Sequence, residues 1–363
     1  MLNPATIGRL ASILAAADPA TDRWAAVAVS AEAIDGIGLS DRARLIRDAI
    51  LEDAPPGYGG LSAVVRRSLG QADFTGWMIW PVTEAVATAA VARDDEQSFD
   101  DGLNLLAELT PRLTSEFALR TFLNKDMERT LGMALTWTKD DNEGVRRLAS
   151  EGTRPKLPWA RRVARLTAQP EATLTILDRL HTDPSETVRR SVANHLNDIS
   201  QIAPDVAVET AIRWSATPDE HTAAVIRHSM RTLIKRADPR ALRLLGYEAA
   251  GVSVSAPRLQ RSSIVEGDEL TFEVTLTNED AKEARLMVDY VIHFLKSNQR
   301  TSARVFKIGP YVLAPGQSKH ITRRHGFKKV TTRTHYSGPH AIEMQVNGRR
   351  YGPTAFDPQV PPR

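Results

Sequence analysis

A pattern that recurs along the first two thirds of this chain constrains its fold more than any other feature. Residues 141–149 read Asp-Asn-Glu-Gly-Val-Arg-Arg-Leu-Ala, and residues 183–193 read Asp-Pro-Ser-Glu-Thr-Val-Arg-Arg-Ser-Val-Ala. The two copies are 43 positions apart, measured from Val145 to Val188, and a third, weaker copy begins at Thr217. This spacing is typical of HEAT-like solenoids, in which each repeat is a pair of helices that stacks on its neighbours to bury an apolar face.

Residues 1 to about 250 carry the apolar spacing of amphipathic helices. Leu, Ile, Val and Ala recur every three or four residues, with short breaks at Asp, Pro, Gly and Asn. The Asp-Pro-Ser-Glu segment at 183–186 supplies an N-cap, an early proline and early acidic side chains, which favour a helix start. The predicted helices are 42–51, 61–69, 74–92, 102–109, 114–123, 125–137, 142–149, 171–181, 185–198, 206–216 and 220–236.

The pattern changes near Gly251. Residues 270–277 alternate apolar and polar side chains, as a half-buried strand does. Further strand candidates are 284–295, 305–313, 319–325 and 341–346, whereas the Pro-rich tail 351–363 is predicted to be irregular. These five candidates belong to a pattern of about seven short strands in about 105 residues, which favours an immunoglobulin-like sandwich. The fold class is therefore multi-domain α + β, with a HEAT-like repeat domain at 1–248 followed by an all-β immunoglobulin-like domain at 252–363.

Composition excludes several classes of protein. The 363 residues are 42% hydrophobic and 25% charged, as in ordinary globular proteins, and no apolar run reaches the roughly 18 residues of a membrane span. The lack of cysteine excludes disulfides and thiolate metal sites. The chain also shows no export signal. We expect a cytoplasmic monomer with no metal, no cofactor and no membrane partner.

Charge is distributed unevenly between the two predicted domains. From Val252 onward the chain has 17 basic residues against 10 acidic ones, whereas the region before it carries a slight acidic excess. Basic pairs occur at Arg323-Arg324, Lys328-Lys329 and Arg349-Arg350. A basic module on a weakly acidic body indicates an anionic partner. On charge alone, a solvated basic surface without a partner is an equally good interpretation.

The segment 150–159 interrupts the regular helical pattern. It reads Ser-Glu-Gly-Thr-Arg-Pro-Lys-Leu-Pro-Trp, and its two prolines forbid a continuous helix. We expect Glu151 near a helix end and Trp159 at the entry of the next helix. Irregular joins with charged and aromatic side chains are where function concentrates in regular scaffolds. The remaining tryptophans of the helical region, Trp77, Trp80, Trp137 and Trp214, are interpreted as core residues.

Polar residues also recur four positions apart, which predicts that they share helix faces. The sets are Arg112/Glu116/Arg120, Arg147/Glu151, Arg190/Asn194/Asp198 and Arg227/Arg231/Lys235. In stacked repeats, equivalent faces form one continuous surface, here a basic one with three embedded carboxylates. For any single pair, an ordinary exposed salt bridge is the simpler interpretation.

A basic concave surface with an aromatic side chain favours nucleic-acid binding. Carboxylates oppose DNA binding, so they require another task. Breaking an N-glycosidic bond generates an oxocarbenium-like sugar, which negative groups stabilise. If the base is already alkylated and cationic, it leaves without help from a general acid. The enzyme then needs only negative potential, a positioned water and an aromatic face against the sugar.

Residues 115–123, 151–159 and 188–198 together resemble the AlkC branch of the AlkC/AlkD-type DNA glycosylases. The resemblance covers residues 1 to about 250, and some AlkC-type proteins also carry a C-terminal immunoglobulin-like domain. It implies a bacterial base excision repair enzyme that removes N3-methyladenine or N3-methylcytosine from alkylated double-stranded DNA. It also implies that the enzyme leaves an abasic site, uses no cofactor and is nucleoid-associated when it is bound to DNA.

The resemblance implies roles for individual residues. Glu116, Glu151 and Asp198 become the active-site carboxylates and Trp159 the aromatic contact to the lesion nucleotide. We expect the second domain to contact DNA as well. The expected DNA-binding residues of the helical domain are Arg112, Arg120, Arg147, Arg154, Lys156, Arg161, Arg190, Asn194, Arg227, Arg231 and Lys235.

Two other functions remain open at this point. The first is a non-catalytic HEAT-repeat scaffold that binds DNA or protein, since helical repeat arrays are commonly scaffolds. The three carboxylates distinguish such a scaffold from a glycosylase, because a protein that only binds DNA gains nothing from them. The second is an extracellular adhesion module, against which the missing export signal argues.

Overall fold

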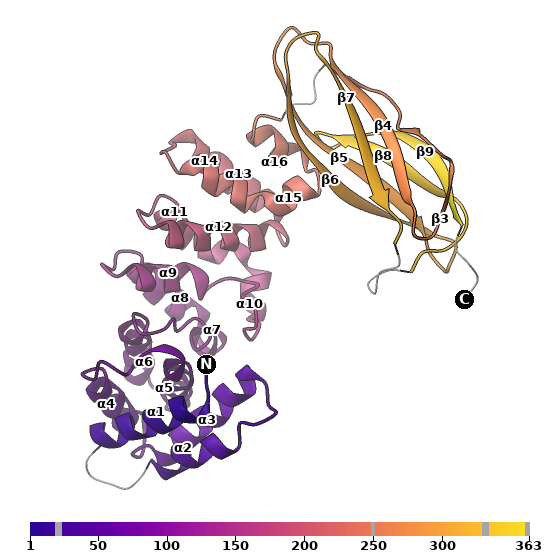
Figure 1. Ribbon diagram of the computed structural model, residues 1–363. Helices are drawn as coiled ribbons and strands as arrows, with labels where there is room; N and C mark the ends of the chain where they lie inside the picture. Colours follow the sequence, from indigo (N-terminus) through magenta and orange to yellow (C-terminus); the bar gives the residue numbers. More distant parts are fainter. Residues whose placement is uncertain (19–23, 248–250, 329–333, 360–363) are drawn as a thin grey trace. The chain divides into compact units, whose positions relative to one another are not determined.

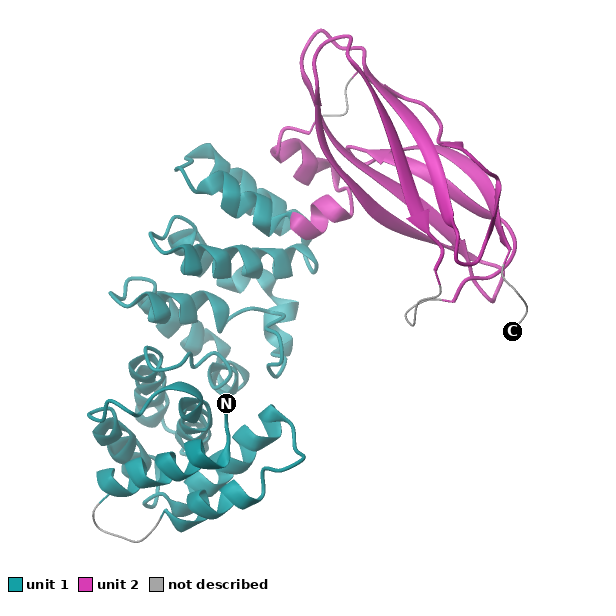
Figure 2. Ribbon diagram, in the orientation of Figure 1, with its two compact units in different colours: residues 1–230 teal, residues 231–363 magenta. Residues whose placement is uncertain are grey.

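The computed structural model describes residues 1–18, 24–247, 251–328 and 334–359, which form two compact units. Figure 2 shows them as Met1–Met230 and Arg231–Arg363. The division expected at 248/252 follows the change from helices to strands, whereas the compact units divide earlier because two short helices group with the strands. Lys329 and residues 248–250, where the first predicted domain ends, lie outside the described residues.

The first unit is helical throughout its described residues (Figure 1). Its helices are α1 (Pro4–Ala17), α2 (Ala25–Val29), η1 (Ser30–Glu32), α3 (Leu39–Asp53), α4 (Tyr58–Ser68), η2 (Gly76–Met78), α5 (Ile79–Ala92), α6 (Glu96–Leu109), α7 (Leu119–Lys125), α8 (Met127–Trp137), α9 (Glu143–Glu151), α10 (Ala164–Ala168), η3 (Pro170–Thr173), α11 (Leu174–Leu180), α12 (Glu186–Ser200), α13 (Pro204–Ala216) and α14 (Thr222–Ser229). In the described ranges, no helix is both long enough and apolar enough to cross a membrane.

Neighbouring helices of this unit stack in two layers. α9, α12 and α14 pack against one another in that order, and α8, α11 and α13 each pack behind one or two of them. The sequence of α12 explains the stacking. Val188, Val192 and Leu196 recur every fourth residue and are all fully buried, so this face must be covered by neighbouring helices. The predicted helical architecture of the first region is confirmed.

Two predicted helices are shorter than expected. α7 begins at Leu119 rather than at residue 114, because the Ser115 hydroxyl donates to the carbonyl of Leu106 and holds the preceding residues in a turn. Arg112 and Glu116 therefore precede the helix, and the prediction that they share a helix face with Arg120 is wrong. The predicted helix 220–236 is also broken, because Met230 leaves helical geometry and ends α14.

The second unit opens with α15 (Arg231–Lys235) and α16 (Pro239–Leu244) and continues as strands. The strands are β1 (Val252–Val254), β2 (Arg258–Leu259), β3 (Ser263–Val265), β4 (Glu269–Asn278), β5 (Ala284–Leu295), β6 (Thr301–Leu313), β7 (Ser318–Gly326), β8 (His340–Val346) and β9 (Arg349–Gln359). Because Arg231 and Lys235 lie on α15 and Arg227 lies on α14, the predicted basic strip does not run along one helix.

Two sheets enclose the apolar core of the second unit. One contains β1, β4 and β2 with β7 paired to β4, and the other has the order β3-β9-β8-β5-β6. Phe272 of β4 and Ile292 of β5 are fully buried within one core cluster. The prediction of an irregular tail is wrong for residues 351–359, since β9 pairs antiparallel with β8 and parallel with β3, and residues 360–363 lie outside the described residues. Its prolines misled the prediction, because prolines are usually depleted from strands.

Candidate active site

The chain leaves the helical layer at the end of α9. Glu151 is the last residue of that helix, and the next helix begins only at Ala164. Pro155 and Pro158 keep the intervening residues out of a helix. The expectation that Trp159 enters the next helix is wrong. Its backbone has φ of 63°, and its side chain is 84% exposed. A positive φ is uncommon for a bulky residue and accompanies functional sites in many proteins.

The residues between α9 and α10 form a loop, which we define as residues 152–163. The guanidinium of Arg120 holds this loop by hydrogen bonds. Arg120 donates to the carbonyls of Gly152 (3.0 Å), Arg154 (2.8 Å) and Arg161 (3.0 Å), and it is only 1% exposed. Burial, followed by repulsion from Arg154, lowers the pKa of Arg120 to about 10. The contact to DNA predicted for Arg120 requires a guanidinium at the surface. The structure instead makes Arg120 a residue that positions both ends of the loop.

Arg154, the third residue of the loop, bridges two of the predicted carboxylates. Its Nε and Nη2 donate to the two oxygens of Asp198 (2.9 and 3.2 Å), and its Nη1 donates to Glu151 (2.6 Å). All three side chains are buried. Burial acts to lower the pKa of Arg154, but its bonds and charge interactions with Asp198 and Glu151 outweigh burial and raise it. Burial also raises the pKa of Asp198, although Arg154 opposes that shift.

Arg147 links the third carboxylate to this pair. Its Nη1 lies 3.0 Å from Oε2 of Glu116, and its Nη2 lies 3.8 Å from Oε2 of Glu151. Glu116 also accepts a hydrogen bond from the Thr114 hydroxyl (3.2 Å). Carboxylates and guanidiniums thus alternate from Glu116 to Asp198. Within these five side chains the carboxylates outnumber the guanidiniums by one, so the array keeps a negative charge.

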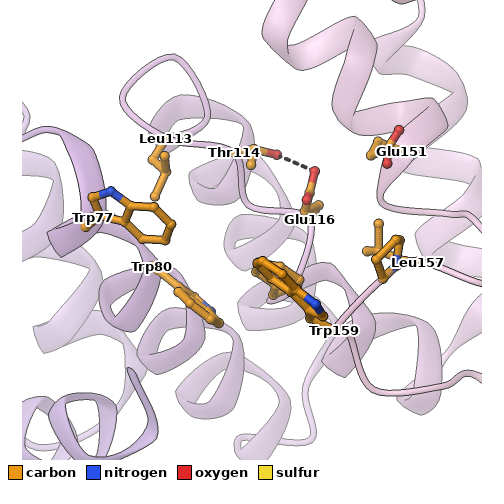
Figure 3. A pocket seen from close by; sticks show the side chains of 10 residues that line it. Trp77, Trp80, Leu113, Thr114, Glu116, Glu151, Leu157 and Trp159 are labelled. Carbon is orange, nitrogen blue, oxygen red and sulfur yellow. Dashed lines mark hydrogen bonds between the residues drawn. The ribbon is translucent and has the colours of Figure 1, made fainter. Parts of the chain in front are cut away.

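A cleft of about 310 Å³ opens beside two of these carboxylates (Figure 3). Glu116 and Glu151 line it, whereas Asp198 does not. The rest of the lining is mostly apolar and aromatic: Trp77, Trp80, Leu113, Thr114, Phe117, Leu157, Pro158 and Trp159. Trp80 stacks on Phe117 with ring centroids 4.8 Å apart, which gives the wall a fixed shape. An aromatic cleft with carboxylates at one side suits a cationic, flat ligand.

The sequence-based interpretation of Trp77 as a core residue is wrong. It is 37% exposed and forms part of the cleft, next to Trp80 at a centroid distance of 6.3 Å. The preceding Gly76 has φ of 73°, so the chain turns there before the helix begins. That glycine was the one available signal. Trp80, Trp137 and Trp214 are buried as predicted.

His195 of the neighbouring helix α12 forms a hydrogen bond to the end of α9. Its Nδ1 donates to the carbonyl of Ser150 (2.8 Å), so its Nε2 accepts from the Thr173 hydroxyl (3.0 Å). The ring is fully buried, and burial lowers the pKa of His195 to about 3. His195 therefore remains neutral and fixes the residue directly before Glu151.

Three of the other expected DNA-binding residues form hydrogen bonds within the protein, and five are exposed. Arg112 donates to backbone carbonyls, including that of Leu69 (2.9 Å). Lys156 donates to Gln201 (3.1 Å), and Asn194 accepts from His228 (2.9 Å) if that ring nitrogen carries the proton. The exposed side chains are Arg161, Arg190 and Arg227 in the first unit and Arg231 and Lys235 in the second.

Comparison with other proteins finds a family model that matches part of the second unit and a protein similar to most of the chain. Residues 253–359 match the family model described as "Uncharacterised protein YhaZ, C-terminal Ig-like domain". The uncharacterized protein YhaZ of Bacillus subtilis is 38% identical over 251 residues, which cover 69% of this chain and 70% of that protein. The likeness therefore extends well beyond the immunoglobulin-like domain.

A solved structure matches almost the whole chain. The alkylpurine DNA glycosylase AlkC of Pseudomonas fluorescens, bound to DNA containing an abasic site analog, superimposes with a TM-score of 0.80. It is 34% identical, and the match covers 98% of each chain. The match therefore spans both the helical region and the strands that follow.

Proposed function

Because the chain belongs to the AlkC branch of the AlkC/AlkD-type family, we propose that it is a DNA repair glycosylase acting on cationic alkylated bases. The proposed substrates are N3-methyladenine and N3-methylcytosine in double-stranded DNA, and the product is an abasic site. One observation carries the proposal. Glu116, Glu151 and Trp159 line a single cleft whose remaining walls are aromatic and apolar.

The chemistry requires little from the protein. The bond between C1′ of the sugar and the base nitrogen breaks, and its electron pair leaves with the base, which becomes neutral. Water adds to C1′ and releases a proton. Positive charge develops on the sugar in the transition state, so a fixed negative charge beside C1′ lowers the barrier.

Glu151 is the carboxylate that best fits this role. It lines the cleft, and its Oε1 is held by Arg154 at 2.6 Å, which fixes its orientation before substrate binds. Asp198 lies outside the cleft with both oxygens bound to Arg154. We assign Glu151 to the sugar cation and the attacking water, Glu116 to the negative potential beside it, and Asp198 to positioning Arg154.

DNA contact is proposed for the exposed basic side chains. In the helical unit these are Arg161, Arg190 and Arg227, and Arg147 at 26% exposure reaches the surface between the carboxylates. In the second unit Arg323 and Arg324 are exposed on β7. We propose that the immunoglobulin-like domain adds phosphate contacts, because its basic residues exceed its acidic ones.

The test is release of free methylated bases from DNA treated with a methylating agent, resolved by chromatography. We expect release by the wild-type protein and a loss of about a hundredfold or more in Glu151→Gln. Glu209→Gln is a matched control, since Glu209 is exposed on the outer helix α13. Equal release by wild type and Glu151→Gln contradicts the role of Glu151.

The scaffold alternative makes a different prediction. A DNA-binding scaffold retains DNA affinity but releases no base. It binds DNA more tightly when Glu116 and Glu151 are replaced by glutamine, because two negative charges are removed from the cleft. Binding without release in every methylated DNA tested contradicts the glycosylase proposal.

A further inference from the structure

A second cavity lies on the same layer of helices as the cleft, one repeat further along the stack. Its volume is about 250 Å³, and it opens between α12 and α14, which pack against each other (Figure 1). The cavity is lined by Glu186, Arg189, Arg190, Ala193, His221, Ala224, Val225 and His228. None of these residues lines the cleft beside Glu151, so the two cavities are separate.

The two cavities differ in charge although they occupy related positions in the repeat. Arg147 corresponds to Arg190, and Glu151 corresponds to Asn194. A neutral amide thus stands in the second repeat where the first has a carboxylate. The second cavity is lined by two guanidiniums and by one carboxylate, that of Glu186. It therefore favours an anion, whereas the carboxylates of the cleft favour a cation.

The two guanidiniums have different surroundings. Arg189 donates through Nη1 to the carbonyls of Asp183 (2.6 Å) and Pro184 (2.9 Å), which hold its charge at the start of α12. Arg190 is exposed, so its N–H groups can turn towards a ligand. The planar guanidinium of arginine matches two oxygens of a phosphate at once, which makes phosphate the anion that this pair suits best.

The rest of the lining suits the sugar that adjoins each phosphate of a DNA strand. The side chain of His221 is 37% exposed, and its Nε2 lies 3.8 Å from Oε1 of Glu220, which is too long for a hydrogen bond. A neutral imidazole N–H can donate to a phosphate oxygen. Ala193 and Val225 are buried and add apolar surface beside these polar groups.

The packing of the helices relates this cavity to the cleft. α12 packs against α9, and α14 packs against α12. The axes of packed helices lie about 8–10 Å apart, so a cavity between α12 and α14 lies roughly 12–15 Å from α9 along the stack. Each nucleotide of a duplex strand advances ~3.4 Å along the axis. For a strand that follows the stack, this distance corresponds to about four nucleotides.

We propose that the cavity between α12 and α14 binds one phosphate of the strand that carries the lesion, about four nucleotides from the base that is removed. Arg190 and His221 donate to its oxygens, and the adjoining sugar packs against Val225. The proposal rests on the glycosylase function and on the DNA contact of Arg190. It adds that this phosphate fixes the register of the strand, so that C1′ of one particular nucleotide lies at Glu151.

The experiment removes the charge of one phosphate at a time. Duplexes carry one N3-methylcytosine at a defined position and one neutral methylphosphonate, which is moved along the lesion strand nucleotide by nucleotide. Single-turnover base release is measured with protein below saturation. We expect release to fall by about tenfold at one position, about four nucleotides from the lesion, and less at its neighbours, because a charge-assisted contact is lost there.

Arg190→Gln and His221→Gln connect the sensitive position to this cavity. In each variant the methylphosphonate at that position should have little further effect, because the contact that it removes is already lost, whereas methylphosphonates elsewhere act as in wild type. Arg179→Gln is the matched control, since it removes an exposed arginine from α11 in the outer layer and should keep the wild-type pattern. Circular dichroism verifies that each variant is folded.

The outcomes separate this inference from the function on which it rests. If the wild-type protein releases base from the unmodified duplex but no methylphosphonate position differs from its neighbours, the phosphate site is overturned and the glycosylase stands. The same holds if a sensitive position persists unchanged in Arg190→Gln and His221→Gln. If no base is released from the unmodified duplex, the glycosylase proposal fails and the site fails with it. One sensitive position that disappears in these two variants supports the site.

Discussion

Helices α9 and α12 begin with the same sequence pattern, but of these two only α9 ends at the cleft that Glu116, Glu151 and Trp159 line. Arg147 of α9 corresponds to Arg190 of α12, and Glu151 corresponds to Asn194. After Glu151 the chain turns into the loop 152–163, whereas α12 continues to Ser200. The candidate site arises where one repeat stops early and its neighbour does not.

The additional turn of α12 contributes directly to the site. It carries Asp198 to the position where Arg154 of the loop binds both of its oxygens. A shorter α12 would leave Arg154 buried with Glu151 as its single carboxylate partner among these residues. The difference in length between two equivalent helices thus creates both the loop and the ion pair that holds it.

Asp198→Asn tests this comparison most strongly. It removes one charge of a buried pair, so we expect the free energy of unfolding to fall by about 3 kcal/mol and base release to fall by about tenfold or more as Arg154 shifts. Urea denaturation and single-turnover release measure the two effects.

Asn194→Ala is the matched control for Asp198→Asn, one turn earlier on the same helix. Asn194 occupies the position of Glu151 in its repeat, but it does not line the cleft. We expect a smaller loss of release than in Asp198→Asn. An equal loss in both variants would show that the two repeats do not differ in the way proposed.

Arg120→Met tests whether the loop itself is positioned. Three loop carbonyls lose their donor, which costs about 3 kcal/mol, and release per folded molecule falls roughly tenfold because Trp159 and Arg154 are displaced. Arg120→Lys should restore part of the rate, since an ammonium can donate to the same carbonyls.

Arg146→Met controls for destabilisation without loop displacement. Arg146, which is half-buried, forms an ion pair with the buried Asp183 (2.7 Å), and neither residue lines the cleft. This variant should unfold more easily but retain its rate of release per folded molecule. If both variants lose release equally, the effect of Arg120 is merely structural.

The burial of His195 predicts that the free energy of unfolding depends on pH. Its pKa is about 3 in the folded state and about 6.5 when unfolded, so the unfolded state binds the extra proton between these values. Stability is therefore full above pH 6.5 and falls as pH decreases towards 3, by at most ~1.4 kcal/mol per pH unit.

His195→Asn removes this titration while keeping a donor to the carbonyl of Ser150. The variant should show a shallower loss of stability between pH 6.5 and 4 in urea denaturation series. Measurements above pH 7, where the ring is neutral in both states, give the baseline. An unchanged slope would mean that His195 is not the group responsible.

The smallest expected effects concern exposed basic residues of the loop and of α12. Arg161→Gln and Arg190→Gln should each weaken DNA binding regardless of sequence and reduce the salt slope of the binding constant by about 1. Titrations at several salt concentrations measure this. A reduced slope only for Arg161 would place DNA on the loop and not on α12.

Much of the fold could be predicted because it depends on local pattern. The four-residue spacing of Val188, Val192 and Leu196 predicts α12, and the alternation at 270–277 predicts β4. The break at Pro155 also predicts the loop. In contrast, the prediction for residues 351–359 is wrong, because β9 is stabilised by hydrogen bonds to β8 and β3, and the local proline pattern does not indicate this pairing.

The residue types of the site were visible in the sequence, but their partners were not. Trp77 and Phe117 are separated from Trp159 by tens of residues, and no spacing relates them. Arg120 and Arg154 resemble surface arginines in the sequence. Whether a guanidinium meets DNA, a carbonyl or a carboxylate depends on which helix ends pack around it.

The sequence alone determined the helical array, the strand-rich second region and the position of the interruption after Glu151, since periodicity and proline act within a few residues along the chain. The tertiary structure decided which charges are buried. It placed Arg120 under the loop, Arg154 between Glu151 and Asp198, and Trp77 at the cleft. The physical reason is that burial and ion pairing depend on the distances between side chains. The packing of the helices determines these distances, whereas separation along the sequence does not.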